Sequence, residues 1–279
     1  CKLVIYFKQA KRESYTIIDG AYEKFVNKEE LTIGTLTYER TLESTKWLAL
    51  YVPFEIPVAT LIDLGYEVAY LNDVRSYDNW IGSKNDNKPG QDGVIDDMVV
   101  ESVILKAGKL KANHPYIIRA KSEAAKEMRL VLNEVKLRKT SEQTTVECSS
   151  AYTKYIIGGT YVTAGRNVLT GDATGNTPCY GIQTATGNWA KLSEKARLTP
   201  FRLFFYMPKK DGSPVVVEGD ATESIRMRVI GESEDETTDI EYYDYVDESV
   251  DYIYDLHGRR VMEPQKGGIY IINGKKVVF

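Results

Sequence analysis

The sequence is divided into short runs of β-branched and aromatic residues, separated by clusters of Gly, Asn, Asp and Ser. The clearest run is Ser224–Ile230, in which Ile225, Met227 and Val229 alternate with polar residues. An alternation with a period of two places every second side chain on the same face of a β-strand. Many such runs between turn residues are typical of an all-β domain. We expect further strands at Thr35–Thr41, Trp47–Pro53, Tyr66–Leu71, Val99–Lys106, Pro115–Ala120, Met128–Leu132, Lys154–Tyr161 and Phe201–Met207.

Helical patterns are few and short. Ser122–Met128 and Leu192–Leu198 are the two segments that we expect to form short helices. Neither is long enough to cover a parallel sheet, which argues against βαβ units. The sequence therefore predicts an all-β fold of antiparallel β-sandwich units.

The C-terminus carries the strongest local signal. Ile269–Ile272 and Lys275–Phe279 flank the pair Asn273-Gly274. Both central residues of a type I′ turn need a positive φ, which Asn and Gly adopt at low cost. We therefore expect a small C-terminal β-hairpin element.

A shift in charge indicates the domain organisation. Residues 232–255 contain eleven Asp or Glu and no Lys or Arg, whereas residues 256–279 are mainly basic. An acidic run of this kind is typical of a solvated linker. We expect residues 1–32 to supply N-terminal strands or a connection from a preceding repeat, and residues 33–232 to form a β-sandwich module of one or two packed units. Residues 233–249 are expected to be an acidic linker, and residues 250–279 a C-terminal β element.

Composition excludes some classes of partner. The formal net charge is −4, which offers no basic field for nucleic acid. No stretch approaches the roughly 18 apolar residues of a membrane-spanning helix, so no transmembrane segment is expected. Tyrosine is unusually abundant, with 20 Tyr against 7 Phe. Tyrosine suits pleated sheets, and it also suits sugar-binding and protein-binding surfaces.

Three cysteines, Cys1, Cys148 and Cys179, cannot all pair with one another. Either a disulfide between Cys148 and Cys179 or two buried thiols would agree with the sequence. Cys1 is compatible with a lipidated N-terminus, but the strand-like run Lys2–Phe7 favours a chain that starts within a longer protein.

Two stretches resemble known bacterial families. Leu36–Thr41, Trp47–Phe54, Val68–Val74, Leu110–Lys121, Glu147–Ser150 and Ile225–Ile230 resemble a module of secreted surface proteins from Bacteroides and Prevotella. In that family the module follows BspA-like leucine-rich repeats or Ig-like repeats. Ile253–Val261 and Lys266–Val277 resemble the closing half of the C-terminal sorting domains of type IX secretion, which are small β-sandwiches. The resemblance implies an extracellular or outer-membrane location, and a sorting-like role for residues 250–279.

No pattern in the sequence points to catalysis. The two histidines, His114 and His257, lie in predicted turns without a triad or metal-ligand spacing. Gly158-Gly159 lies within a strand pattern, which indicates a β-bulge or a tight bend rather than a phosphate loop. With 40 Asp and Glu, carboxylate pairs carry no specific signal for a glycosidase. We therefore expect that the chain is not an enzyme and needs no cofactor.

One segment partly matches a calcium loop. In Asn85–Asp97, the run Asp92-Gly93-Val94-Ile95-Asp96 is similar to the middle of an EF-hand loop. In this register Asp92 and Asp96 would be the metal ligands, but positions 1 and 3 fall on Lys88 and Gly90, and position 12 falls on Val99. The ordinary interpretation is a polar loop, with weak calcium binding as the alternative.

The sequence therefore favours a non-catalytic, adhesin-like interaction module of a secreted or surface protein, whose partner is a host protein or a glycan. The alternative is a carbohydrate-binding accessory domain of a glycan-utilisation system, and a more distant one is a glycoside hydrolase. Exposed aromatic residues among Trp80, Tyr161, Tyr180 and Trp189 would favour carbohydrate binding.

Overall fold

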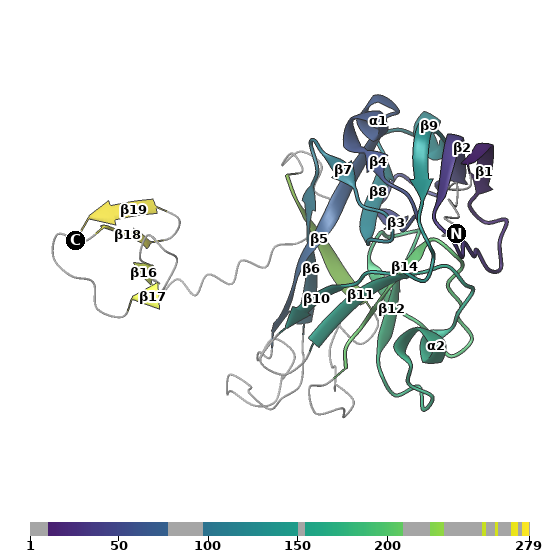
Figure 1. Ribbon diagram of the computed structural model, residues 1–279. Helices are drawn as coiled ribbons and strands as arrows, with labels where there is room; N and C mark the ends of the chain where they lie inside the picture. Colours follow the sequence, from purple (N-terminus) through teal and green to yellow (C-terminus); the bar gives the residue numbers. More distant parts are fainter. Residues whose placement is uncertain are drawn as a thin grey trace, which may run out of the picture. The chain divides into compact units, whose positions relative to one another are not determined.

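The computed structural model describes residues 11–77, 97–149, 154–208 and 224–231, together with short strands between residues 253 and 278. The chain divides into two compact units, residues 1–232 and residues 233–279. Almost all regular structure in both units is β-strand, and most strand pairs are antiparallel (Figure 1). The predicted all-β fold is confirmed.

A three-stranded sheet contains the first two described strands of the chain (Figure 1). It contains β1 (Lys11–Ile18), β2 (Leu31–Thr41) and β9 (Glu127–Leu137), in the order β1-β2-β9. β2 pairs antiparallel with β9, whereas β1 pairs parallel with β2. Ile17 of β1 is fully buried in the core. β1 therefore contributes to the core of the first unit.

The second sheet is large and curled (Figure 1). Its order is β10-β11-β14-β12-β13-β15-β6-β5-β8-β3, and β15 with β6 is its one parallel pair among the described residues. Its strands are β3 (Leu48–Leu50), β5 (Tyr66–Tyr77), β6 (Asp97–Ile104), β8 (Tyr116–Ala120), β10 (Val146–Ser149), β11 (Lys154–Thr160), β12 (Cys179–Ile182), β13 (Trp189–Lys191), β14 (Arg202–Tyr206) and β15 (Ser224–Ile230). In β15, Ile225 and Met227 are buried and Arg226 and Arg228 are exposed, as the alternation predicted.

The helices are very short. They are α1 (Val58–Asp63), the 3-10 turn η1 (Glu123–Lys126) and α2 (Arg166–Thr170). η1 lies within the predicted helix Ser122–Met128, but the prediction of a helix at Leu192–Leu198 was wrong. Leu192 N–H donates to the Cys179 carbonyl, and Leu198 exchanges two hydrogen bonds with Ala164. These strand-like bonds use the backbone groups that a helix would need.

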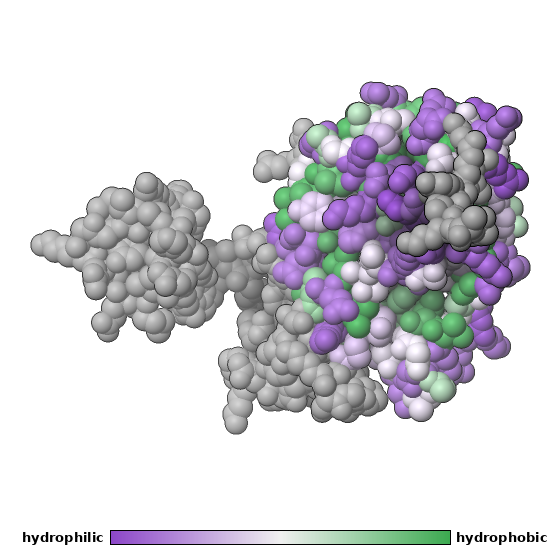
Figure 2. Space-filling model, in the orientation of Figure 1, coloured by the Kyte–Doolittle hydropathy of each residue, from purple (hydrophilic) through white to green (hydrophobic). Residues whose placement is uncertain are grey.

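The two sheets of the first unit share one hydrophobic core. Tyrosines form much of it, and Tyr51, Tyr155, Tyr161 and Tyr180 are each at most 2% exposed. Phe201 packs edge-on against Tyr161 at a ring-centroid distance of 5.9 Å. The visible surface carries mostly hydrophilic residues, with small hydrophobic areas between them (Figure 2). Among the residues whose burial is described, seven tyrosines therefore belong to the buried core.

The paired glycines of β11 have a packing role. A Cβ at Gly159 would lie 2.0 Å from the Tyr51 ring, and one at Gly158 would lie 2.8 Å from the Phe204 ring. The ladder between β11 and β14 continues through both positions without a register shift. The expected bulge or bend is therefore absent, and the glycines allow two aromatic rings to lie directly on the backbone.

Two buried asparagines hold the loop that follows β9. The Asn113 side chain donates to the Lys139 carbonyl and accepts a 2.6 Å hydrogen bond from the Tyr161 hydroxyl. The Asn27 side chain donates to the carbonyls of Leu137 and Arg138. These bonds satisfy buried carbonyl groups and fix the end of β9 in the fold.

The second unit contains a four-stranded sheet in the order β17-β16-β18-β19. Its strands are β16 (Ile253–Tyr254), β17 (Arg260–Val261), β18 (Ile269–Ile272) and β19 (Lys275–Val278). β18 and β19 pair antiparallel, with Ile272 opposite Lys275. The predicted C-terminal hairpin is confirmed.

Candidate functional site

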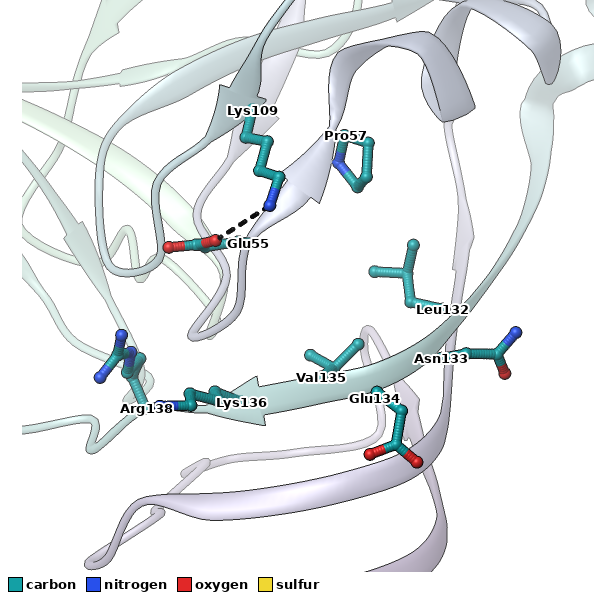
Figure 3. Close-up of a pocket in the computed structure, with 9 residues that line it drawn as sticks. All are labelled: Glu55, Pro57, Lys109, Leu132, Asn133, Glu134, Val135, Lys136 and Arg138. Atoms are coloured by element: carbon teal, nitrogen blue, oxygen red, sulfur yellow. Dashed lines mark ion pairs between the residues drawn. The ribbon is translucent and has the colours of Figure 1, made fainter.

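A shallow groove lies between β9 and a small two-stranded sheet. That sheet consists of β4 (Ile56–Pro57) and β7 (Lys109–Leu110). The groove has a volume of about 280 Å³ (Figure 3). We call it the β9 groove, and it is lined by Glu55, Pro57, Lys109, Leu132, Asn133, Glu134, Val135, Lys136 and Arg138.

Within this groove, the alternation of core-facing and exposed side chains along β9 shifts by one residue. Met128, Leu130 and Leu132 face the core, and the inward positions then become Val135 and Leu137. Glu134 adopts a left-handed backbone with φ of 51°, which is uncommon for a residue other than glycine. Leu132 and Val135 both face inward as a result, and Asn133 and Glu134 are consecutive exposed residues. Figure 3 shows Leu132 and Val135 on the side of β9 that faces Pro57.

Charged side chains surround this apolar floor. Lys109 Nζ lies 4.0 Å from Glu55 Oε2, and both side chains are more than half exposed. Lys136 Nζ lies 3.5 Å from Glu30 Oε1, and Arg138 forms an ion pair with the same carboxylate. Exposed pairs of this kind are weak and can exchange partners. The groove therefore offers an apolar floor with a rim of both charges, an arrangement suited to recognition.

A second hollow of about 330 Å³ lies beside the first half of β9. Its lining includes Ile18, Glu39, Glu127 and Arg129. Arg129 Nε lies 3.3 Å from Glu39 Oε1, and the Thr41 hydroxyl donates to Glu127 at 2.9 Å. Both hollows are thus lined by β9, one near each end of the strand.

The candidate calcium ligands Asp92 and Asp96 lie outside the described residues. Among the residues that the structure describes, no group of three or more His, Cys, Asp or Glu side chains is arranged to hold a metal ion. Calcium binding by this loop therefore stays a prediction.

His114 is part of the packing around Asn113. Its Nδ1 lies 3.1 Å from the Thr144 hydroxyl, and its ring packs edge-on against Tyr116. Burial, with a contribution from the charge of Lys111, lowers the pKa of His114. His114 therefore packs within the turn before β8. His257 lies outside the described residues.

Three of the four aromatic residues considered for sugar binding are in the core. Trp189 and Tyr180 are fully buried, and Tyr161 is 2% exposed. Trp80 lies outside the described part of the chain. A flat sugar-binding platform cannot use the three buried rings.

Cys148 and Cys179 are both free thiols, which removes the disulfide alternative. Burial raises the pKa of Cys179 to about 12. Burial, together with the charge of Asp73, also raises the pKa of Cys148. Neither thiol is therefore activated as a nucleophile. Cys1 lies outside the described residues.

The groove residues were not identified from the sequence. We predicted the strand only as Met128–Leu132, although β9 continues to Leu137. The sequence did contain a signal for the longer strand. Apolar residues alternate at Met128, Leu130 and Leu132, and a second alternation at Val135 and Leu137 is offset from it by one residue. Such an offset indicates a local irregularity in a strand, and irregularities often lie beside functional sites.

Comparisons of the chain with family models, with curated proteins and with solved structures found no match. No helix in the described parts of the structure has the length and apolar character needed to cross a membrane.

Proposed function

We propose that this chain is a non-catalytic, adhesin-like interaction module of a secreted or surface-exposed bacterial protein. We further propose that its partner is a host protein, which it binds through the β9 groove. The observation that carries this proposal is the groove itself, with an apolar floor at Leu132 and Val135 and an exposed charged rim. Protein interfaces commonly combine an apolar centre with a polar rim.

The exposed charged rim of the groove supports a macromolecular partner. Small-molecule sites are usually concave cavities that enclose most of the ligand, with volumes of roughly 300–1,000 Å³. The β9 groove, at about 280 Å³, is at the lower end of that range, and its rim carries exposed charges. A shallow surface of this kind fits one segment of a larger chain better than it fits an enclosed ligand.

The state of the described histidine and cysteines supports a non-catalytic role. A catalytic acid, base or nucleophile needs a pKa matched to the reaction. Burial raises the pKa values of the two thiols, and the His114 ring contacts Thr144 and Tyr116 within a structural turn.

A binding screen with charge-reversed variants tests the proposal. Purified chain is applied to an array of host matrix proteins and to a glycan array. The variants Lys109→Glu and Lys136→Glu alter the groove rim, and Lys195→Glu is a matched control at an exposed position away from it. We expect binding to a protein, weakened about tenfold by each groove variant and unchanged by the control. Binding only to glycans, or equal binding by all variants, would contradict the proposal.

A further inference from the structure

The hydrogen-bond register of β9 shows which of its backbone groups face away from β2. Leu42 N–H donates to the Lys126 carbonyl. The β2–β9 register ends at Thr41 opposite Glu127, and continuing it by one position places Leu42 opposite Lys126. Hydrogen-bonded and non-hydrogen-bonded pairs alternate along an antiparallel ladder. Even-numbered residues of β9 up to Leu132 therefore bond to β2, and Arg129, Val131 and Asn133 turn their backbone groups outward.

A hydrogen bond between β2 and the residue that follows β1 independently indicates the same direction for the backbone groups of β9. Asp19 N–H donates to the Glu39 carbonyl, so the backbone of Glu39 faces β1 and not β9. Arg129 lies directly opposite Glu39 in the β2–β9 register. The backbone groups of Arg129 must then point away from β2, toward the free edge of the sheet.

This edge has no backbone partner within the described residues. β9 ends the sheet order β1-β2-β9 and pairs with β2 alone. The Val131 side chain is 41% exposed, and the Arg129 side chain is 67% exposed. Proteins usually protect a long edge with proline, a short strand or a covering loop. β9 has 11 residues and no proline.

We propose that the edge of β9 from Arg129 to Asn133 binds an extended segment of the partner protein as an additional β-strand. The inference rests on the proposed function and specifies how the partner binds. A row of outward N–H and C=O groups is complementary to another extended backbone. The edge continues at Asn133 into the β9 groove, which would receive the next side chains of the bound segment.

The side chains of β9 specify the chemistry of that segment. Val131 lies between Arg129 and Asn133 on the exposed face. Residues directly opposite each other in a sheet contact through their side chains. The bound segment should therefore carry a β-branched apolar residue opposite Val131, an acidic residue opposite Arg129 and a hydrogen-bonding residue opposite Asn133. These three residues would be spaced two apart, because alternate residues share one face of a strand.

Amide exchange of the free full-length chain tests the geometry of the edge. The amides of Arg129, Val131 and Asn133 should exchange with solvent at least about tenfold faster than those of Leu130 and Leu132. Equal protection of both sets would show that the edge is already covered, and it would overturn the inference without affecting the proposed function.

Binding to selected peptides tests the occupant. A random peptide library displayed on phage is selected on the full-length chain, and the selected peptides are measured in solution. Val131→Pro removes one outward N–H and leaves the ladder to β2 intact, because that amide does not bond to β2. Val131→Thr is the control, because it retains the amide and the branched side chain. We expect Val131→Pro to weaken binding at least about fivefold and Val131→Thr to change it less than about twofold.

A scan of N-methylated peptides completes the test. Methylation should weaken binding at every second position only, because alternate amides of an added strand face β9. Tight binding without this period, or without sensitivity to Val131→Pro, would refute strand addition while leaving the groove as a binding site. If no peptide is selected, the inference fails, whereas the proposed function is decided separately by the array of host proteins. A homodimer that Val131→Pro dissociates would show that a second copy of the chain occupies the edge, and it would overturn the assignment to a partner.

Discussion

Arg202 Nη1 lies 3.0 and 2.8 Å from the two carboxylate oxygens of Asp19, which is 183 positions earlier in the chain. Asp19 follows β1 and Arg202 begins β14, so this contact joins the two sheets of the first unit. The Asp19 carboxylate is completely buried, and it also accepts a 2.8 Å hydrogen bond from Tyr38. Arg40 Nε lies 3.3 Å from the same carboxylate. The Asp19 carboxylate therefore interacts with two arginines and one tyrosine.

Asp19→Asn should destabilise the first unit by about 3–5 kcal/mol, because it leaves buried guanidinium groups without their counter-charge. Urea unfolding at neutral pH, followed by tryptophan fluorescence, measures the change. Glu39→Gln, which breaks the exposed pair with Arg129, is the control and should cost under about 1 kcal/mol. Similar losses in the two variants would show that the buried cluster is not important for stability.

Gly159→Ala should destabilise the protein by about 3 kcal/mol. An added Cβ would lie 2.0–2.3 Å from ring atoms of Tyr51, so the ring or the strand would have to move. In a Tyr51→Ala background, the same substitution should cost at least about 1 kcal/mol less, because alanine lacks the Cγ and Cδ atoms that lie nearest to the added Cβ. Equal costs in the two backgrounds, measured by urea unfolding, would show that Tyr51 is not the obstacle.

The ion pair between Glu67 and Arg119 should make stability depend on pH. Arg119 Nη2 lies 2.6 Å from Glu67 Oε2, and Lys121 Nζ lies 3.5 Å from Oε1. Burial alone would raise the pKa of Glu67, but the hydrogen bonds and charge of Arg119, with the charge of Lys121, outweigh burial and lower it. Because the folded pKa is below the unfolded value, the stabilisation is complete above the unfolded pKa of about 4.3. This stabilisation is lost as the pH falls through the pKa of Glu67 in the folded chain.

Glu67→Gln tests this dependence. At pH 7 the variant should be less stable than the natural chain by about 1 kcal/mol, and the difference should shrink as the pH falls below about 4. Glu55→Gln breaks an exposed pair and should change the unfolding free energy by under about 0.5 kcal/mol at either pH. A difference for Glu67→Gln that is constant with pH would argue against the ion pair as its cause.

The elements that depend on local pattern were predictable from the sequence. Ser224–Ile230 has the same bounds as β15, and the hairpin around Asn273-Gly274 forms with the expected pairing. Both are specified by residues close together in the chain. The parallel pairing of β15 with β6 was not predictable in this way, because it brings Arg226 beside Val99 from a distant part of the chain.

The candidate site could not be predicted for the same reason. The β9 groove exists because the β4–β7 pair lies beside β9, and no local pattern links Lys109 to Val135.

The helix predicted at Leu192–Leu198 was wrong because distant residues, Cys179 and Ala164, form the backbone hydrogen bonds of Leu192 and Leu198. Local propensity decides an element only where tertiary contacts do not compete with it.

The loop Asn85–Asp97 should bind calcium weakly or not at all. In the EF-hand register, Asp92 and Asp96 supply carboxylates, but Lys88, Gly90 and Val99 occupy three other ligand positions. Calcium needs six to eight oxygen ligands, and affinity falls as the number of charged ligands falls. Calorimetric titration of the full chain should therefore show no binding tighter than about 100 μM, the range of weak extracellular sites. Asp92→Ala and Asp96→Ala should behave like the natural chain. Sub-micromolar binding that either substitution abolishes would show that residues outside this register complete a calcium site.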